Sequence, residues 1–412
     1  MIAFCNQLFS RAVLLSFCIS GALAAATHTA SAEPQPAQTW PPMVFYVAKG
    51  DPNACGRGCS EWIAAEGVIA KDSPQQLRDL LKRLGQRKLP IFFHSPGGSV
   101  EAAMTIGRMM RERRMRAGVG RTIPRGCDPL QEREAACDAL KRTGRELLAE
   151  LRTARTMCNS SCVYALIGAA VREVGAGARI GVHQIAAGRY DERGLPVRID
   201  RKKVSEDQLR QLRTAEDRLA RYVADMGIDK GLLEAAAQIA HERVRFLSLN
   251  EIARFGIDRR EFHESRWMLD EGPPGPLAVV KFVVEAKGSE PKEYRITRVR
   301  LSCGRTGEIR VEYSRELSSL DNPASIAVTT RSDALVLAPP RGKPVLGYND
   351  VQIESRLARV PVAFFEDAAA GDAIEITQAP NVSMPDKTSK PTRLALDGLS
   401  DSIGALAKQC RR

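Results

Sequence analysis

Short apolar runs alternate with helix-like stretches between residues 43 and 262, and this alternation constrains the fold more than any other feature. Strand-like runs occupy residues 43–48, 90–93, 115–120 and 179–184, and helix-like stretches occupy 73–84, 99–113, 158–170 and 205–225. The first helix has a serine N-cap at Ser73 and a proline in its first turn. Such alternation is typical of a largely parallel sheet with helices on both faces. We therefore expect an α/β domain over residues 43–271.

Two segments depart from this alternation. The stretch of about 122–156 is polar, helix-prone and holds two cysteines, so we expect an inserted helical hairpin or long loop. A Gly/Pro-rich linker at 272–276 precedes short β-prone runs. These runs predict a second, β-rich domain over residues 277–412, at 278–285, 294–303, 308–313, 325–330, 334–338 and 360–365. We expect a helix within residues 392–410 to close that domain.

The first 32 residues have the pattern of a secretory signal peptide. An apolar run follows Arg11, and Ala30-Ser31-Ala32 forms a small-residue cleavage site. Residues 33–42 would then be a linker rich in Pro, Gln and Ala. An uncleaved anchor is the alternative, but the run is short for a full span. We expect a periplasmic or secreted protein that does not span the membrane after cleavage.

Eight cysteines follow the signal peptide, and an even number in an oxidising compartment indicates disulfides. We expect Cys303 to pair with Cys410, because these two alone lie in the C-terminal region. The sequence leaves open the pairing of the other six, which are Cys55, Cys59, Cys127, Cys137, Cys158 and Cys162. A zinc site built from the two C-x3-C pairs is the alternative, although no histidine has finger-like spacing. We expect no metal and no cofactor.

The formal net charge of +12 does not indicate a nucleic-acid partner. The basic residues are scattered among many acidic ones, and no nucleic-acid-binding motif is recognisable. A weak attraction to an anionic envelope surface fits this charge better.

Three short segments combine residue types that serve nucleophilic catalysis. Gly97 and Gly98 follow a strand and precede a helix, where backbone amides can stabilise an oxyanion. Ser160 and Ser161 open an apolar helix, and a serine there can be an exposed nucleophile. His183 ends a strand, where an imidazole can take a proton from a hydroxyl. Each segment alone also has a structural explanation: a strand-to-helix turn, two N-cap serines and a core histidine.

Together these segments resemble the proteolytic subunit of Clp protease and its secreted relatives. The resemblance rests on the motifs Ser95-Pro96-Gly97-Gly98-Ser99, Cys158-Asn159-Ser160-Ser161-Cys162 and Val182-His183-Gln184. It covers about residues 43–262 and implies the ββα spiral of the ClpP/crotonase fold. It makes Ser160 the nucleophile and His183 the general base, with Ser161 as the rival nucleophile. The amides of Gly98 and Ser161 would form the oxyanion hole, and Gly97 would shape the turn.

The family's third catalytic residue is an aspartate, and the matching position here is Val244. Glu242 or Asp191 would be possible third members, although neither matches the motif. Loss of the third member weakens such a site severely without erasing all catalysis.

The resemblance implies a periplasmic serine hydrolase, most simply a peptidase acting on a peptide or protein. Two alternatives are a catalytically degenerate binding or scaffold protein of the cell envelope and a crotonase-like acyl-CoA enzyme. Helix 205–225 would pack between subunits of a homo-oligomer if it acts as the family's handle helix, and a solvated helix is the alternative. The substrate and the role of the C-terminal domain stay open.

Overall fold

The computed structural model describes residues 40–128, 134–199, 204–270, 277–288, 292–305, 307–317, 325–337, 344–346, 352–379 and 392–410. The predicted signal peptide, residues 33–39 of the first linker and the whole linker at 272–276 lie outside this range. Within it, no helix combines the length and the apolar character needed to cross a bilayer.

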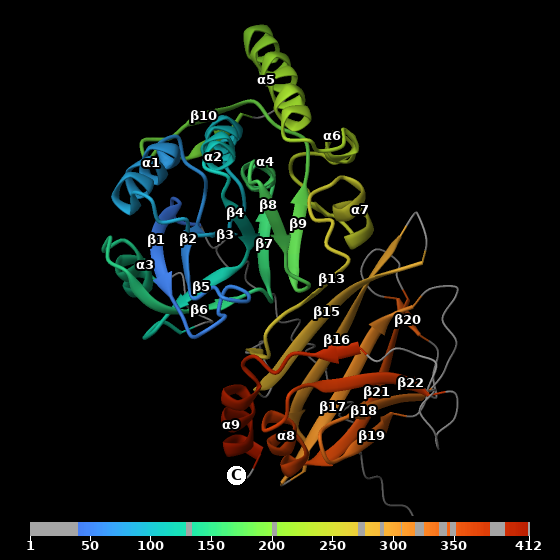
Figure 1. Ribbon diagram of the computed structural model, residues 1–412. Helices are drawn as coiled ribbons and strands as arrows, with labels where there is room; N and C mark the ends of the chain where they lie inside the picture. The colour runs from blue at the N-terminus through green and yellow to red at the C-terminus, as the bar shows by residue number, and fades with distance from the viewer. Residues whose placement is uncertain are drawn as a thin grey trace, which may run out of the picture. The chain divides into compact units, whose positions relative to one another are not determined.

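The α/β alternation is present, and it forms two sheets (Figure 1). The larger sheet has the strand order β5-β6-β1-β2-β3-β4-β8. Its strands are β1 (Val44–Lys49), β2 (Glu61–Glu66), β3 (Ile91–His94), β4 (Arg116–Val119), β5 (Arg121–Pro124), β6 (Leu147–Arg152) and β8 (Val171–Val174). The smaller sheet has the order β12-β9-β7, with β7 (Thr156–Asn159), β9 (Ala178–Val182) and β12 (Arg245–Phe246). Strands β2, β3, β4 and β8 run parallel to one another, as do β7 and β9.

Helices cover these strands with their apolar faces. They are α1 (Ser73–Leu84), α2 (Val100–Glu112), α3 (Ala135–Lys141), α4 (Ser161–Ile167), α5 (Glu206–Asp225), α6 (Gly231–Ala237) and α7 (Leu249–Arg254). Helix α1 buries all four of its leucines, each of which stabilises the fold by about 2 kcal/mol on burial. A Cβ at Gly168 would lie 2.2 Å from the Gly107 Cα, so α4 and α2 meet backbone to backbone. The Tyr222 hydroxyl donates to the Tyr164 carbonyl oxygen at 2.7 Å and ties the end of α5 to α4.

The helical insertion expected over 122–156 is wrong. Its described residues, 122–128 and 134–156, hold one short helix, α3, between the strands β5 and β6, which pair antiparallel at the edge of the main sheet. Strand β6 also pairs in parallel with β1. Leu151 and Ala149 alternate inward along β6, and burial against the sheet outweighs the helical propensity of this segment.

Two further boundaries differ from expectation. Thr156–Asn159 is a strand rather than the start of the helix predicted over 158–170. The run 360–365 is not a strand, since β21 (Gln352–Pro361) ends at Pro361 and α8 (Val362–Ala369) begins there. Short apolar runs do not distinguish strand from buried helix by periodicity.

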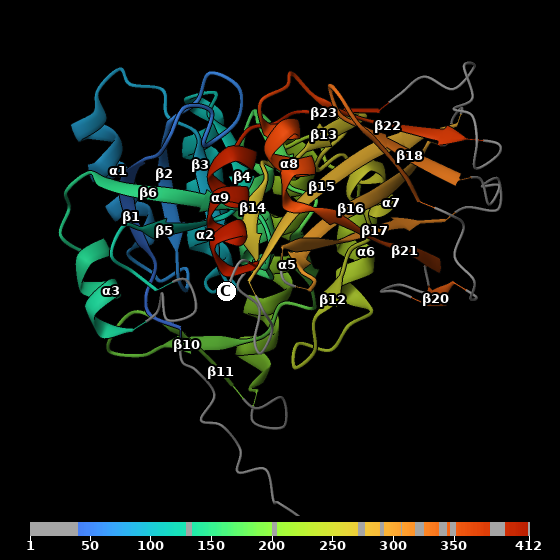
Figure 2. The same ribbon diagram turned by 90° about the horizontal axis from the view of Figure 1, so that it is seen from below.

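The described residues of the C-terminal part form two antiparallel sheets and two helices. One sheet comprises β13 (Phe262–Glu264), β14 (Met268–Asp270), β15 (Ala278–Lys287), β16 (Glu293–Cys303), β17 (Glu308–Glu316), β20 (Val345–Leu346) and β21. Figure 2 shows β15, β16, β17 and β21 side by side. The other comprises β18 (Ser325–Thr329), β19 (Ala334–Leu337), β22 (Ile374–Ala379) and β23 (Thr392–Leu394). Residues Trp40–Arg412 group into one unit, so a boundary between independent domains at 272–276 stays a prediction.

The eight cysteines of the described residues form four disulfides. Three are local, joining Cys55 to Cys59, Cys127 to Cys137 and Cys158 to Cys162. The fourth joins Cys303 to Cys410, the pair proposed from the sequence, and links β16 to the C-terminal helix α9 (Leu399–Cys410). The alternative zinc site from the two C-x3-C pairs is wrong, because those thiols are bonded to each other. The described residues contain no cluster of three or more potential metal ligands.

Candidate active site

Three neighbouring strand ends bring the three sequence motifs to one edge. Cys158 on β7 pairs with Ile180 on β9, and Ser95, directly after β3, forms a parallel bridge to Cys158. The chain therefore leaves three adjacent parallel strands at the same side. The residues just beyond those ends are the glycine turn at 97–98, Ser160 and His183.

Ser160 has an unusual backbone conformation for a residue with a side chain. Its φ is +56° and its ψ is −126°, and it joins β7 directly to α4. Its N–H donates to the Gly181 carbonyl oxygen at 2.7 Å, and the Cys158–Cys162 disulfide brackets it. Such strained residues at a sharp strand-to-helix turn cost of order 1–3 kcal/mol and are typical of exposed nucleophiles.

The rival serine lies in a different environment. Ser161 is fully buried, and its hydroxyl has no hydrogen-bond partner among the described residues. Ser160 is partly exposed. A buried hydroxyl is inaccessible to a substrate carbonyl, so this comparison favours Ser160 over Ser161.

His183 lies beside Ser160 on the next strand. The parallel strands β7 and β9 place Asn159 opposite Gly181, and Ser160 is therefore opposite Val182. His183 lies one residue beyond that pair. Adjacent strands are about 4.8 Å apart. In the described residues the Ser160 hydroxyl forms no hydrogen bond, and none joins it to His183.

A backbone carbonyl orients the His183 ring. The Nδ1 atom lies 2.7 Å from the Gln184 carbonyl oxygen, which only accepts, so Nδ1 carries the hydrogen. Nε2 of the neutral ring is then free to accept a proton. Burial lowers the pKa of His183 below its ordinary value, which keeps the ring neutral near pH 7. Gln184 is held in turn by its own N–H, which donates to the Ile239 carbonyl oxygen at 2.9 Å, and by a side-chain hydrogen bond to the Ala237 carbonyl.

Neither carboxylate suggested as a third member bonds to His183. Glu242 lies 3.1 Å from Nε2 of His241, and its side chain is 65% exposed. Asp191 accepts from the Arg193 and Leu195 amides in the turn between β10 (Gly188–Tyr190) and β11 (Pro196–Arg198).

The aspartate position of the resembling family lies next to the histidine. Strand β12 pairs Arg245 with Val182, so Val244 is level with His183. The register thus places Val244 opposite His183 on the neighbouring strand, and the Gln184 carbonyl lies against Nδ1. Sequence reasoning missed this role of Gln184, because the interacting group is a backbone carbonyl, which does not depend on the residue type.

The glycine turn lies against Ser160. A Cβ at Gly97 would come within 2.7 Å of the Ser160 Cβ, and one at Gly98 within 2.2 Å of the Ile69 carbonyl oxygen. Both glycines have positive φ, so this approach needs residues without a side chain. Across the described residues, the amides of Gly98 and Ser161 form no hydrogen bond. Two such free amides beside a serine can hold a developing oxyanion.

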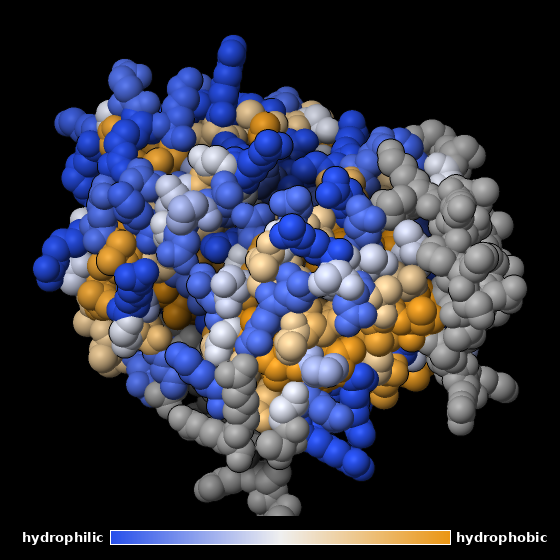
Figure 3. All heavy atoms as spheres, turned by 60° about the horizontal axis from the view of Figure 1, so that its bottom comes forward, coloured by the Kyte–Doolittle hydropathy of each residue, from blue (hydrophilic) through white to orange (hydrophobic). Residues whose placement is uncertain are grey.

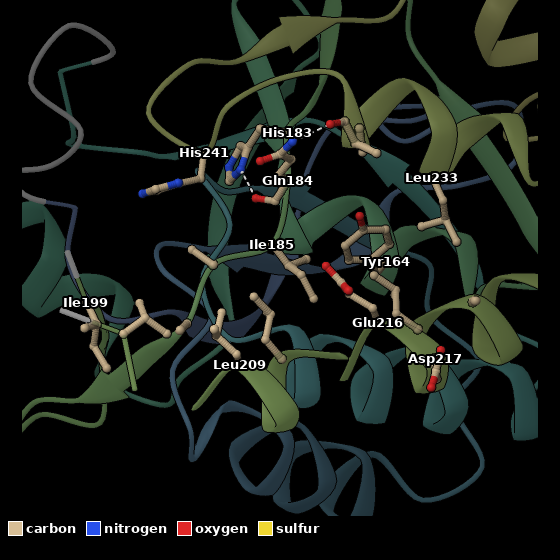
Figure 4. A pocket seen from close by; sticks show the side chains of 18 residues that line it. Tyr164, His183, Gln184, Ile185, Ile199, Leu209, Glu216, Asp217, Leu233 and His241 are labelled. Carbon is tan, nitrogen blue, oxygen red and sulfur yellow. Dashed lines mark hydrogen bonds between the residues drawn. The ribbon is translucent and has the colours of Figure 1, made fainter. Parts of the chain in front are cut away.

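A pocket of about 520 Å³ begins at His183. Its walls come from the segment after β9, from Tyr164 on α4 and from helices α5 and α6. Most of its side chains are apolar, including Ile185, Leu209, Leu212, Leu219 and Leu233. Figure 4 shows His183 and Gln184 at one end of this pocket, with Ile185, Tyr164 and Leu209 further along its wall.

Comparison with known proteins gives only distant likenesses. No family model matches the chain, and no curated protein matches it. Two solved structures of ClpP1 from Listeria monocytogenes, one of them a mutant, are 17% and 18% identical over 47% of this chain, and cover 85% and 88% of theirs. A mutant of the 1510-N membrane-bound stomatin-specific protease is 16% identical, covering 47% of this chain and 75% of that one. All three have a TM-score of 0.28, so they say nothing about the chemistry of the site.

Proposed function

We propose that the chain is a serine hydrolase that cleaves peptide bonds with Ser160 and His183. The observation that carries this proposal is the positive φ of Ser160 at the junction of β7 and α4, one strand away from a neutral, oriented imidazole. If this serine had no catalytic role, the strain would destabilise the fold without benefit. Glycine at this position would avoid the strain.

The proposed reaction has two stages. Ser160 Oγ attacks the substrate carbonyl carbon, its proton moves to Nε2 of His183, and the amides of Gly98 and Ser161 hold the oxyanion. His183 then gives the proton to the leaving amine, and an acyl-enzyme remains. His183 takes a proton from water, the oxygen of that water attacks the ester carbonyl, and His183 returns the proton to Ser160 as the carboxylic acid product leaves and ionises.

We also propose an exported, periplasmic or secreted location. Four disulfides support it, because disulfides persist in oxidising compartments. We expect no ATPase partner for a protein in such a compartment. Association of copies through α5 stays a prediction.

A fluorophosphonate probe tests the nucleophile directly. The mature, oxidised chain is treated alongside Ser160→Ala, Ser161→Ala and Ser205→Ala, the last removing an exposed serine at the start of α5. We expect labelling of wild type and of Ser205→Ala, and none of Ser160→Ala. Labelling that is lost in Ser161→Ala but kept in Ser160→Ala would make the rival serine the nucleophile. A folded wild type without any labelling would contradict the hydrolase.

That last outcome would favour the second candidate, a binding or scaffold protein on the same fold. Val244 beside His183, and the absence of any carboxylate bonded to this ring among the described residues, are the observations in its favour.

A further inference from the structure

A hollow of about 460 Å³ lies between three loops of the α/β part. The loops contain residues 57–60, 88–90 and 113–116, and they lead into β2, β3 and β4. Because these strands are parallel, their amino ends meet at one edge of the sheet. The glycine turn follows the carboxyl end of β3, so the hollow and the candidate active site lie at opposite edges.

Cations dominate the lining of this hollow. Its charged residues are Arg57, Lys88, Arg113, Arg114 and Arg116, with Glu61 as the single carboxylate. Glu61 is bound by Arg87 at 2.9 Å and by Lys49 at 3.6 Å, so two further cations already neutralise it. The hollow is therefore a concentrated positive site on a chain with a formal net charge of +12.

Most of these cations have no carboxylate partner. Arg57, Lys88 and Arg114 are exposed and form no ion pair with any residue that the structure describes. Arg113 reaches only the Gly85 carbonyl oxygen, at 3.5 Å. Arg116 has Glu173 at 3.7 Å and also donates to the Cys55 carbonyl oxygen at 3.0 Å. Four of the five lining cations are thus available to an outside anion.

Arg114 stands where the backbone favours glycine. It follows the C-cap of α2 and has a φ of +52°, a left-handed conformation that glycine adopts most easily. The chain instead has a long cationic side chain at this position, and that side chain lines the hollow. The need to end helix α2 therefore does not explain why this position holds an arginine.

The negative ends of nearby helices offset only part of the positive charge of the hollow. Helices α1 and α2 both end at this edge, and cations near a helix C-terminus offset its partial negative charge. Each end carries roughly half an elementary charge, so the two together offset about one cation. After Glu173 is also counted, an excess of about three positive charges remains. Figure 3, with the bottom of Figure 1 brought forward, shows hydrophilic side chains around separate apolar patches on that face.

We propose that this hollow binds an anion with several phosphate groups, either free in solution or displayed as lipid headgroups. Guanidinium groups hold phosphate oxygens with paired N–H donors. Cations on three separate loops match a ligand whose charges are themselves separated. This site does not depend on Ser160, and its ligand need not be the substrate of the hydrolase.

The test compares two double variants that remove equal charge from the mature, oxidised chain. Arg57→Ala with Arg114→Gly removes two cations of the hollow, and the glycine suits the backbone at 114. The control, Arg213→Ala with Arg221→Ala, removes two exposed arginines of α5. Calorimetry with inorganic tripolyphosphate measures the soluble ligand. Sedimentation with vesicles of phosphatidylglycerol, against vesicles of phosphatidylcholine, measures the headgroup.

We expect the hollow variant to bind about ten-fold more weakly or worse. The control variant should change by less than about two-fold at physiological salt. Binding of tripolyphosphate alone would assign a soluble ligand, and additional binding of phosphatidylglycerol vesicles would assign headgroups. Equal weakening in both variants, or no binding of either probe by wild type, would overturn the proposal.

Discussion

Replacing Ser160 by glycine should stabilise the protein relative to replacing it by alanine. Both variants lose the hydroxyl, so they differ in how well each residue adopts a φ of +56° and a ψ of −126° and in the conformational entropy that each loses on folding. Relief of such strain is of order 1–3 kcal/mol. Glycine loses about 0.5–1 kcal/mol more conformational entropy than alanine on folding. The balance favours Ser160→Gly by about 1 kcal/mol.

Thermal unfolding of the two oxidised variants measures this difference. About 1 kcal/mol corresponds to a rise in Tm of about 1–2 °C for a unit of this length. The control is Ala220→Gly, at an exposed position inside helix α5. There glycine should lower the Tm by a similar amount, because a helix interior favours alanine.

The sign of the difference is the decisive result. If Ser160→Gly unfolds at or below the temperature of Ser160→Ala, while Ala220→Gly shows its ordinary loss, the serine is not strained. The main support for a nucleophile at this position would then disappear.

Two further predictions concern the histidine and the longest disulfide. Because burial lowers the pKa of His183, the ring stays neutral to a lower pH than an ordinary imidazole. The rate of fluorophosphonate labelling should therefore fall to half only below about pH 6.5, and a midpoint above pH 7 would refute this placement of the base. Replacing Cys303 and Cys410 by serine opens a loop of sequence separation 107, against a separation of 4 for Cys55 and Cys59. In urea unfolding followed by tryptophan fluorescence, the first double variant should lose about 2–3 kcal/mol more than the second, and equal losses would contradict the loop-entropy argument.

The parallel arrangement and the three site motifs could be predicted because they depend on local patterns. Strand-helix alternation implies parallel strands, and residues after parallel strands gather at one edge. The grouping of Ser160, His183 and the glycine turn into one site also needed the resemblance to the Clp proteolytic subunit, because each segment alone has a structural explanation.

The conformation of Ser160 and the ring partner of His183 could not be predicted in this way. Short apolar stretches lie on both sides of the polar residues 159–161, and such stretches do not distinguish the strand that ends at Asn159 from the helix that follows Ser160. A positive φ at a serine has no sequence signal, unlike one at a glycine. The Gln184 carbonyl also has no sequence signal, since every residue has a backbone carbonyl.

The strand pair at the far edge of the sheet was missed because it depends on distant parts of the chain. Strand β6 is stabilised by β1, which lies far earlier in the sequence, and no local pattern reveals that pairing. Polar residues between the two strands made the segment resemble helix.

The pairing of β6 with β1 also has a consequence for how the chain acquires its structure. As synthesis proceeds, β2 can cover one side of β1 at once, but the other side lacks its partner until Leu147 and Leu148 have been made. Until then β1 presents unpaired N–H and C=O groups, which template aggregation. Such long-range pairing raises contact order and slows folding. A holdase that shields this nascent edge should therefore raise the yield of soluble protein more than one that acts on the completed chain.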